Sequence, residues 1–244
     1  MDIPSYLLGK KSSGGSGNID WSAIGYDDTP LALKNSYNYS KEIYDNWDAT
    51  QTNLEYKFNS NRTLEYMPYV DVSNATNVQY MFYQCSNLKQ VPPFNFSDAI
   101  VSISGMFQNC AMLVVVPLFN TSKVKNMQYT FRNCYYGLET LPLFDTSNVQ
   151  NFGQMCENDS YLKNVPLFNT SKATNFSLMF GSCTNLTNES LDNILQMCIN
   201  ATSYSGTKTL RTLIGNQPSV YPTSKIEALP HYQDFIDAGW TIGY

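Results

Sequence analysis

The chain has 244 residues, of which 43% are hydrophobic and only 14% are charged, and its formal net charge is −5. An apolar share of this size can build a packed core in one domain or two, whereas no stretch reaches the roughly 18 apolar residues that a membrane-spanning helix needs. A weakly charged, acidic chain has little with which to replace counterions on a phosphate backbone, which argues against nucleic acid as a partner.

Residues 1–18 are expected to form a flexible peptide followed by a Gly/Ser linker. The basic pair Lys10 and Lys11 follows a very short apolar patch, whereas a secretory signal places its charges first and has a longer apolar region. No signal peptide is therefore visible. The glycine- and serine-rich stretch after Lys11 predicts that the peptide moves independently of the rest of the chain.

Residues 19–56 carry aromatic and acidic residues that are out of register with the repeat that follows them. One helix is expected from about Tyr37 to Trp47, with Ile43, Tyr44 and Trp47 on one face. Because a stack of repeats needs ends that close off its apolar core, this segment is predicted to be an N-terminal cap.

Residues 57–188 contain a repeat of about 24 or 25 residues, a period that is typical of solenoid proteins. One unit reads Met-Phe-x-x-Cys-x-x-Leu-x-x-Val-Pro-x-Phe, and a polar turn such as Asn120-Thr121-Ser122 follows it. Several columns keep the same register, which chance does not explain. The leading aromatic residue recurs as Phe58, Phe82, Phe107, Phe131 and Phe180, with Cys156 in its place in one unit.

Each unit is expected to form one turn of a coil with two kinds of local structure, which makes the fold an α+β repeat. The Met-Phe-x-x-Cys-x-x-Leu part has the apolar spacing of a short helical turn, and the Leu-x-x-Val-Pro part is predicted to be a short strand. Proline cannot donate to a ladder, so the sheet should be narrow. A column of asparagines is expected to face inward and to bond the backbone of the next rung. Its members are Asn77, Asn126, Asn151 and Asn175, with Ser102 in the remaining unit.

Residues 189–244 are predicted to be a C-terminal cap. Ser190 to Ala201 has helical spacing, and Asn188 or Ser190 is available as its N-cap. Further along the cap, the predicted elements are a strand from Thr209 to Ile214, a helix from Ser224 to Ala238 that Pro230 interrupts, and a terminal strand from Trp240 to Tyr244.

The residues that could carry chemistry favour a protein without a catalytic, cofactor or metal site. One cysteine per unit gives a column of Cys85, Cys110, Cys134 and Cys183, interrupted by Asp159, whereas zinc sites bring their ligands together as close pairs. Free cysteine packs as a small apolar residue, so buried, reduced thiols are expected. His231, the single histidine, lies in the predicted cap without a flanking nucleophile motif.

The expected binding surface lies at the variable positions of the repeats. Exposed tyrosine offers contact area and a hydroxyl group at low entropic cost, which suits recognition of a protein or a glycan; packing of the rings between coils is the alternative. Variable residues of the predicted strands, Val114 among them, complete this surface. The candidate residues are Lys89, Gln90, Val115, Tyr129, Tyr135, Tyr136, Glu139, Thr140, Tyr161, Lys163 and Asn164.

The repeat Met-Phe-x-x-Cys-x-x-Leu-x-x-Val-Pro-x-Phe-[Asn/Asp]-Thr-Ser resembles that of the BspA-like leucine-rich repeat family, over roughly residues 57 to 188. This resemblance implies a right-handed leucine-rich-repeat-type solenoid with N- and C-terminal caps, used for adhesion and protein binding. Departures are local: Asp159 stands in the cysteine column, Cys156 in the phenylalanine column, and Asn61 where the first unit should have cysteine.

The N-terminus is similar to the opening of structural proteins from tailed phages and prophages. Residues 3–11, followed by the glycine-rich linker, and the later segments 19–26 and 39–47 carry this similarity. It implies a virion component that residues 1–11 attach to other virion proteins, with the repeats pointing outward.

Three hypotheses follow from these observations. The first is a non-enzymatic protein that binds a protein or glycan on a cell surface, as a receptor-binding or decoration protein of a phage virion or tail. The second is a BspA-like adhesin located extracellularly on a bacterial surface. The third is an enzyme that uses the C-terminal cap, which would need a pocket that holds His231 and a carboxylate.

Overall fold

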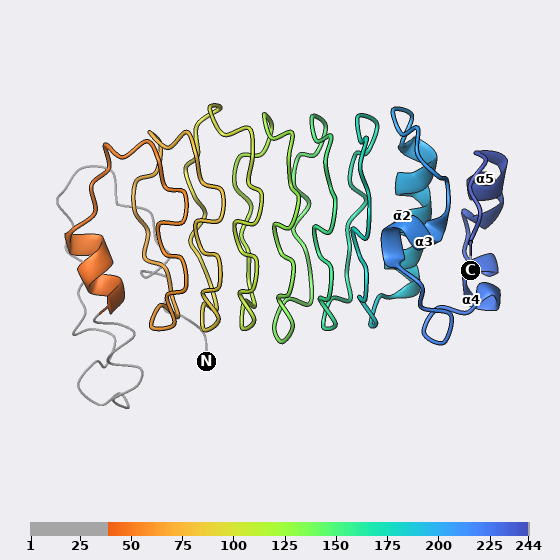
Figure 1. Cartoon of the computed structure of the whole chain (residues 1–244), viewed down its shortest axis with the longest axis horizontal. Helices are drawn as coiled ribbons and strands as arrows, with labels where there is room; N and C mark the ends of the chain where they lie inside the picture. Colours follow the sequence, from red (N-terminus) through yellow and green to blue (C-terminus); the bar gives the residue numbers. More distant parts are fainter. Residues whose placement is uncertain (1–38, 244) are drawn as a thin grey trace.

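The computed structural model describes residues 39–243. The predicted flexible peptide of residues 1–18 and the first part of the predicted N-terminal cap lie outside these residues, as does Tyr244. Figure 1 shows successive coils lying side by side, with a short helix at the N-terminal end of the row and the helices α2 to α5 at the other end.

The N-terminal helix spans residues 39–45, which confirms a helix within the predicted segment. Its partly buried side chains Tyr39 and Ile43 pack against the core, together with Trp47 just beyond its end. The Ser40 hydroxyl donates to the Tyr66 carbonyl at 2.6 Å, and the Trp47 indole N–H donates to the Asp71 carbonyl at 2.8 Å. These two bonds attach the helix to the next coil.

Parallel bridges between residues about one repeat apart hold the coils together. One row runs through the asparagine column, as in the pair Asn126 and Asn151, and a second joins residues such as Gln90 and Val115. Among the described residues each predicted strand is reduced to such single bridges. The first bridge joins Asn53 to Asn77, so the row of coils already begins inside the segment that the sequence assigned to the cap.

The Met-Phe-x-x-Cys part is not a helical turn, so that prediction was wrong. The Met81 N–H donates to the Val78 carbonyl at 3.2 Å, a three-residue turn in which Tyr80 has a φ of 54°. The next N–H bonds outside the coil, because Phe82 donates to the Met106 carbonyl of the following coil at 2.9 Å. Alternate N–H groups are thus used between coils, which is incompatible with the i to i−4 bonding of an α-helix.

Two positions per coil have positive φ, and the second of them carries a ladder that the sequence reading missed. Asn133 donates from Nδ2 to Asn109 Oδ1 at 2.6 Å, and Asn158 donates in the same way to Asn133 at 2.9 Å. Their φ angles are 65°, 65° and 67° along the chain. Asparagine is enriched in this left-handed region, which explains why it recurs there.

The predicted asparagine column has a different role from the one expected. The side chains are only partly buried, and Asn151 Oδ1 accepts from the Gly153 N–H of its own coil at 3.0 Å rather than bonding the backbone of the next rung. Asn126 and Asn175 make the same bond to the residue two positions ahead. An Asx side chain bonds its own backbone two residues ahead in this way where a turn follows, as it does after each of these bridges.

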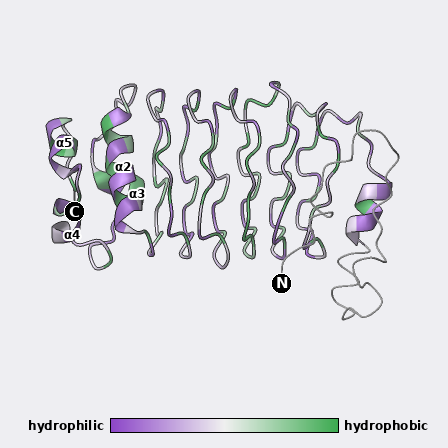
Figure 2. Cartoon of the chain, turned by 180° about the vertical axis from the view of Figure 1, so that it is seen from behind, coloured by the Kyte–Doolittle hydropathy of each residue, from purple (hydrophilic) through white to green (hydrophobic). Residues whose placement is uncertain are grey.

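The core contains a stack of phenylalanine rings from four successive coils. The rings of Phe58, Phe82, Phe107 and Phe131 follow one another at centroid distances of 5.3, 5.5 and 5.7 Å and are nearly parallel. All four are buried. Figure 2 shows hydrophobic and hydrophilic residues alternating along the coils, which lets each coil direct one set of side chains inward and another outward.

The segment predicted to be the C-terminal cap begins with α2 (Asn188–Asn200), which confirms the predicted helix. Its N-cap is Thr187, whose hydroxyl accepts from the Ser190 N–H, and not Asn188 or Ser190 as expected. One face of α2, including Leu191, Ile194 and Leu195, is buried.

The strand predicted from Thr209 to Ile214 is instead α3 (Leu210–Ile214). Only Thr209 forms a bridge, to Thr241, which is also the one bridge within the predicted terminal strand. The carbonyls of Thr212 and Leu213 accept from Leu178 and Phe180 at 2.6 and 2.8 Å, so α3 takes up the donors of the last coil. Residues 210–214 are therefore helical rather than extended, because the helix end has free carbonyls that can accept from the last coil.

The remaining helices are α4 (Thr223–Glu227) and α5 (Tyr232–Asp237), separated around Pro230 as predicted. Trp240 is buried against Phe235 and Tyr204, with ring centroids 6.0 and 5.5 Å away. No helix within residues 39–243 combines the length and apolar character needed to span a bilayer.

Candidate binding surface

Exposed apolar side chains gather on one arc of three consecutive coils. Of the eleven large hydrophobic side chains that are exposed among residues 39–243, nine lie in the segments 112–118, 135–143 and 161–167. These segments occupy equivalent positions in neighbouring coils. We call the nine residues the apolar arc: Met112, Val114, Val115, Leu118, Tyr135, Tyr136, Leu143, Tyr161 and Leu167.

An open groove of about 380 Å³ runs through the arc. Tyr136 and Tyr161 line it, with ring centroids 6.4 Å apart and planes at 78°. Their exposed fractions of 62% and 45% leave the ring faces accessible. The other lining residues combine an apolar wall with polar groups: Val114, Gly137, Glu139 and Thr140.

One extra residue in the fourth coil builds the groove. Four positions separate Cys134 from Leu138, where three separate Cys110 from Leu113. The longer segment carries Tyr136, whose N–H donates to the Ala111 carbonyl at 2.9 Å. A Cβ on Gly137 would lie 2.5 Å from the Leu113 carbonyl oxygen, so only glycine permits this close approach of two backbones.

Ion pairs lie along the same face. Lys89 binds Glu65 at 2.6 Å, Lys163 binds Glu139 at 3.0 Å, and Val114 occupies the equivalent position between them. Partly exposed pairs of this kind contribute at most about 1 kcal/mol to stability. These ion pairs instead make the face around the groove polar without an excess of either charge.

The structure brings together four of the predicted site residues, Tyr136, Glu139, Thr140 and Tyr161, in one groove. Asn164 pairs with Thr140, and Val115 with Gln90, through the bridges beside it. Tyr129 is the exception, because it occupies a positive-φ turn position, with the guanidinium of Arg132 5.6 Å from its ring centre.

The sequence reading missed Met112 and the exposed leucines that follow the repeat proline. Leu118, Leu143 and Leu167 each stand between a proline and a buried phenylalanine. The sequence did contain a signal for these leucines. In an extended segment, the residue next to an inward-facing phenylalanine faces outward.

The cysteine column is buried and each thiol has a partner. Cys85 donates to the Phe58 carbonyl of the preceding coil, and Cys110, Cys134 and Cys183 repeat this contact. Burial raises the pKa of the Cys85 thiol to about 12, and it raises the pKa of the other five thiols as well. Within residues 39–243, no three His, Cys, Asp or Glu side chains are placed to hold a metal ion together.

The six thiols are therefore expected to be unreactive in the folded protein. The thiolate is the form that reacts, and burial both disfavours it and blocks access. Titration with a chromogenic disulfide should give less than about one thiol before denaturation and all six afterwards. A rapid reaction of even one thiol under native conditions would contradict the buried column.

His231 has the carboxylate that the enzyme hypothesis required, but it lies away from the groove. Its Nδ1 is 2.7 Å from Asp192 Oδ2, and its backbone N–H donates to Asp192 Oδ1 at 2.9 Å. Neither residue lines the groove. The pair joins the start of α5 to α2, and this contact gives both residues a structural role.

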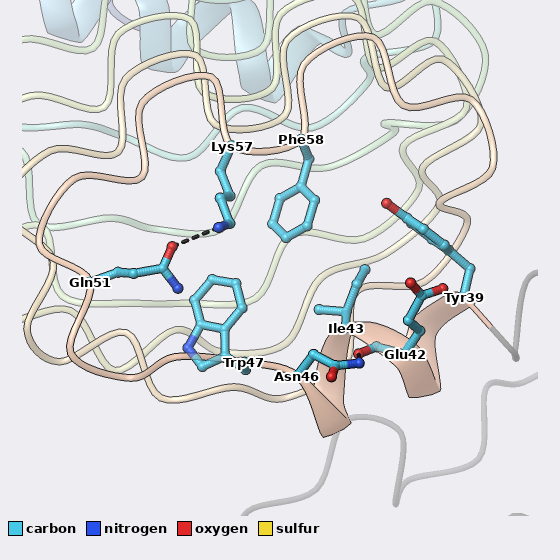
Figure 3. A pocket seen from close by; sticks show the side chains of 8 residues that line it. All are labelled: Tyr39, Glu42, Ile43, Asn46, Trp47, Gln51, Lys57 and Phe58. Atoms are coloured by element: carbon cyan, nitrogen blue, oxygen red, sulfur yellow. Dashed lines mark hydrogen bonds between the residues drawn. The ribbon is translucent and has the colours of Figure 1, made fainter.

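A second hollow, of about 340 Å³, lies at the N-terminal end of the coils (Figure 3). The rings of Trp47 and Phe58 lie 6.2 Å apart on its inner side, and Lys57 Nζ is 5.7 Å from the Trp47 ring centre. Lys57 also donates to Gln51 at 2.6 Å. The helix of residues 39–45 forms the opposite wall.

A family model described as "Mycoplasma protein of unknown function" matches the chain twice, at residues 20–115 and 101–208. The two matches overlap and together take in more than half of the chain. A double match of one model is what a repeated unit produces. No curated protein and no solved structure matches the chain.

Proposed function

The chain belongs to the family described as Mycoplasma protein of unknown function, DUF285, and we propose that it is a non-enzymatic binding protein that recognises a partner protein through the apolar arc. The observation that carries this proposal is the concentration of nine exposed hydrophobic side chains on three neighbouring coils. Contiguous exposed apolar surface marks interaction sites, because leaving it in water is costly unless a partner covers it.

The composition of the arc supports a protein as the partner rather than a glycan. Leu118, Leu143 and Leu167 offer aliphatic area without hydroxyl or amide groups, whereas a glycan needs polar partners along its length. The tyrosines of the groove supply the anchors that commonly dominate protein interfaces. The ion pairs Lys89–Glu65 and Lys163–Glu139 supply the polar rim.

We also propose that the coils form a right-handed leucine-rich-repeat-type solenoid. Single-register bridges between coils and the phenylalanine stack support this class of fold. Such a scaffold would hold the arc rigid, so that a partner would pay little to order it.

Membership of this family supports a surface-associated location. Two settings are proposed: a bacterial surface, where the protein would act as an adhesin, and a phage virion, where residues 1–11 would attach it to the tail. The family description, which names a bacterium, favours the first. Detection of the protein in purified virions would establish the second.

Replacing Tyr136 and Tyr161 together with alanine is expected to weaken binding to intact target cells by at least about 30-fold, because a single anchor residue of this kind already carries about 2 kcal/mol. Binding of the fluorescently labelled full chain to intact cells, measured by flow cytometry, checks this. Protease treatment of the cells should abolish binding, whereas periodate treatment should leave it.

The matched control is Tyr56→Ala, because Tyr56 has the same 45% exposure as Tyr161 but lies in the first coil, outside the arc. This variant should bind as the unaltered protein does. Unchanged binding of the double variant would refute the arc as the binding surface, and loss of binding after periodate alone would assign the arc to a glycan instead.

A further inference from the structure

A hollow of about 330 Å³ adjoins the groove of the apolar arc. Thr140 lines both cavities, and it is bridged to Asn164, which lines the hollow as well. Helix α2 contributes Glu189, Ser190 and Asn193 to the lining, and we call the cavity the α2 hollow. Figure 1 shows α2 lying beside the last coils. Because the two cavities share a lining residue, one partner that covers the groove can also cover the α2 hollow.

Glu189 gives the α2 hollow a negative charge that no cation within residues 39–243 offsets. Its side chain is exposed and takes part in none of the ion pairs among these residues. No other ionisable residue of the described chain lines the hollow. Glu139, which lines the groove, is by contrast paired with Lys163 at 3.0 Å. The charge that a partner has to supply is therefore positive, and its place is the α2 hollow rather than the groove.

The amides of the α2 hollow add hydrogen-bond acceptors to this carboxylate. Asn193 donates from Nδ2 to the Val165 carbonyl at 2.9 Å, and because a carbonyl only accepts, this bond fixes the orientation of the amide. Asn164 likewise donates from Nδ2 to Thr140 Oγ1 at 3.1 Å. Within residues 39–243 neither Oδ1 atom accepts a bond. A donor-rich group is therefore the complement of the hollow.

The rest of the lining is apolar, which suits a long side chain with a charged end. Leu141 and Val165 are buried, and Pro166 is half-buried. Lysine and arginine pack their methylene stems against apolar surface and keep the charged head in a polar environment. An aliphatic or aromatic side chain would instead cover the Glu189 carboxylate without giving it a partner, which is costly.

The start of α2 lies two rungs beyond the Glu139 position of the groove. The Lys163 N–H donates to the Glu139 carbonyl at 2.9 Å, and the Thr187 N–H donates to the Lys163 carbonyl at 3.1 Å in the same way. Thr187 therefore continues the row, and Glu189 follows it by two positions. Since neighbouring rungs are about 4.8 Å apart, the two sites are separated by about 10 Å.

We propose that the partner protein recognised by the apolar arc carries a basic side chain, arginine or lysine, that enters the α2 hollow and pairs with Glu189. This inference rests on the proposed function, because the groove supplies the anchoring contact and the hollow extends it. The partner then presents an apolar anchor and a basic side chain about 10 Å apart, the separation of the two sites.

Replacing Glu189 with glutamine is expected to weaken binding of the full chain to intact target cells by about three- to fivefold, the effect of a partly exposed ion pair. Glu189→Lys should weaken it by at least about tenfold, because it places like charges together. Raising the NaCl concentration from about 0.05 M to about 0.5 M should bring the unaltered protein close to the level of Glu189→Gln and change that variant less. Flow cytometry of the labelled proteins measures all of these.

The matched control is Glu227→Lys, which makes the same change in net charge at an exposed residue of α4 that lines neither cavity. It should bind at least as well as the unaltered protein, so that general attraction to the cell surface is accounted for. Thermal unfolding of each variant shows that it is folded. Glu189→Gln keeps the shape of the side chain, so it decides the question if Glu189→Lys does not fold.

Three results would overturn the proposal. If Glu189→Lys and Glu227→Lys bind equally while the double variant of Tyr136 and Tyr161 loses binding, the α2 hollow is rejected and the apolar arc remains. A lower Tm for Glu189→Gln with unchanged binding would confine Glu189 to stabilising the first turn of α2. If the double tyrosine variant also binds as the unaltered protein does, the proposed function fails and this inference fails with it.

Discussion

Replacing Phe107 with alanine is expected to lower the free energy of unfolding by about 3–5 kcal/mol, the range for removal of a buried phenylalanine. Its side chain is 0% exposed and lies between the rings of Phe82 and Phe131, at 5.5 and 5.7 Å. The coils contact only their neighbours, so the cavity would weaken both interfaces of the third coil. Urea unfolding followed by far-ultraviolet circular dichroism measures the change.

Tyr136→Ala serves as the control for Phe107→Ala, because it deletes a comparable aromatic ring that is 62% exposed. It should alter the free energy of unfolding by less than about 0.5 kcal/mol. Similar small effects for both variants would mean that the phenylalanine rings do not form a common interior stack, and the description of the fold would fail with them.

Replacing Asp159 with cysteine is expected to stabilise the protein at neutral pH by about 1–3 kcal/mol, the range for a buried polar atom that lacks a partner. Asp159 is fully buried in the cysteine column, and its Oδ2 atom has no hydrogen-bond partner. Its Oδ1 accepts from the Cys134 N–H, but that N–H also donates to the Phe131 carbonyl and would keep this bond. Cysteine would restore the thiol-to-carbonyl contact that the other coils make.

The effect should depend on pH in a direction that burial determines. Burial raises the pKa of the folded-state Asp159 carboxyl well above its ordinary value, and the bond from the Cys134 N–H offsets this only in part. In the unfolded chain the carboxyl ionises near pH 4. Between these two pKa values the folded state holds a proton that the unfolded state has lost, so stability falls as the pH rises, by up to about 1.4 kcal/mol per pH unit.

Urea unfolding of the unaltered protein and of Asp159→Cys, from about pH 4 to about pH 8, tests this sign. The two stabilities should differ least at the acidic end and diverge as the pH rises. Asp159→Asn, which keeps the shape and removes the charge, should flatten the curve in the same way. If the free energies of unfolding of all three proteins changed with pH in parallel, the buried carboxyl would not destabilise the folded state.

The sequence identified the phenylalanine, cysteine and asparagine columns that the structure places in register, but not the ladder of Asn109, Asn133 and Asn158. Phe82, Phe107 and Phe131 were aligned by their spacing alone and lie stacked in the core, because coils of nearly equal length bring equivalent residues side by side. For the same reason the sequence placed the cysteines one per coil, whereas it placed Tyr136 and Tyr161 only at variable positions, and the structure brings their rings together. Helix α2 followed from its own apolar period and a polar residue before it.

The local conformation of the coils could not be predicted in this way. The segment around Phe82 has helical spacing, yet its N–H donates to Met106, a residue far along the chain. Helix α3 lies where alternating residues favoured a strand. Its carbonyls accept from the N–H groups of the last coil. In both cases the hydrogen-bond partner is remote in sequence, and a pattern within one segment carries no information about it.

The sequence by itself thus determined which residues share a column, since periodicity and apolar spacing decide what a stack of coils must bury. Only the tertiary structure decided what faces outward as a surface. The groove exists because one extra residue before Leu138 pushes Tyr136 toward Tyr161 while Gly137 lets the backbone touch Leu113. Contact between adjacent coils sets that geometry, and it depends on packing rather than on composition.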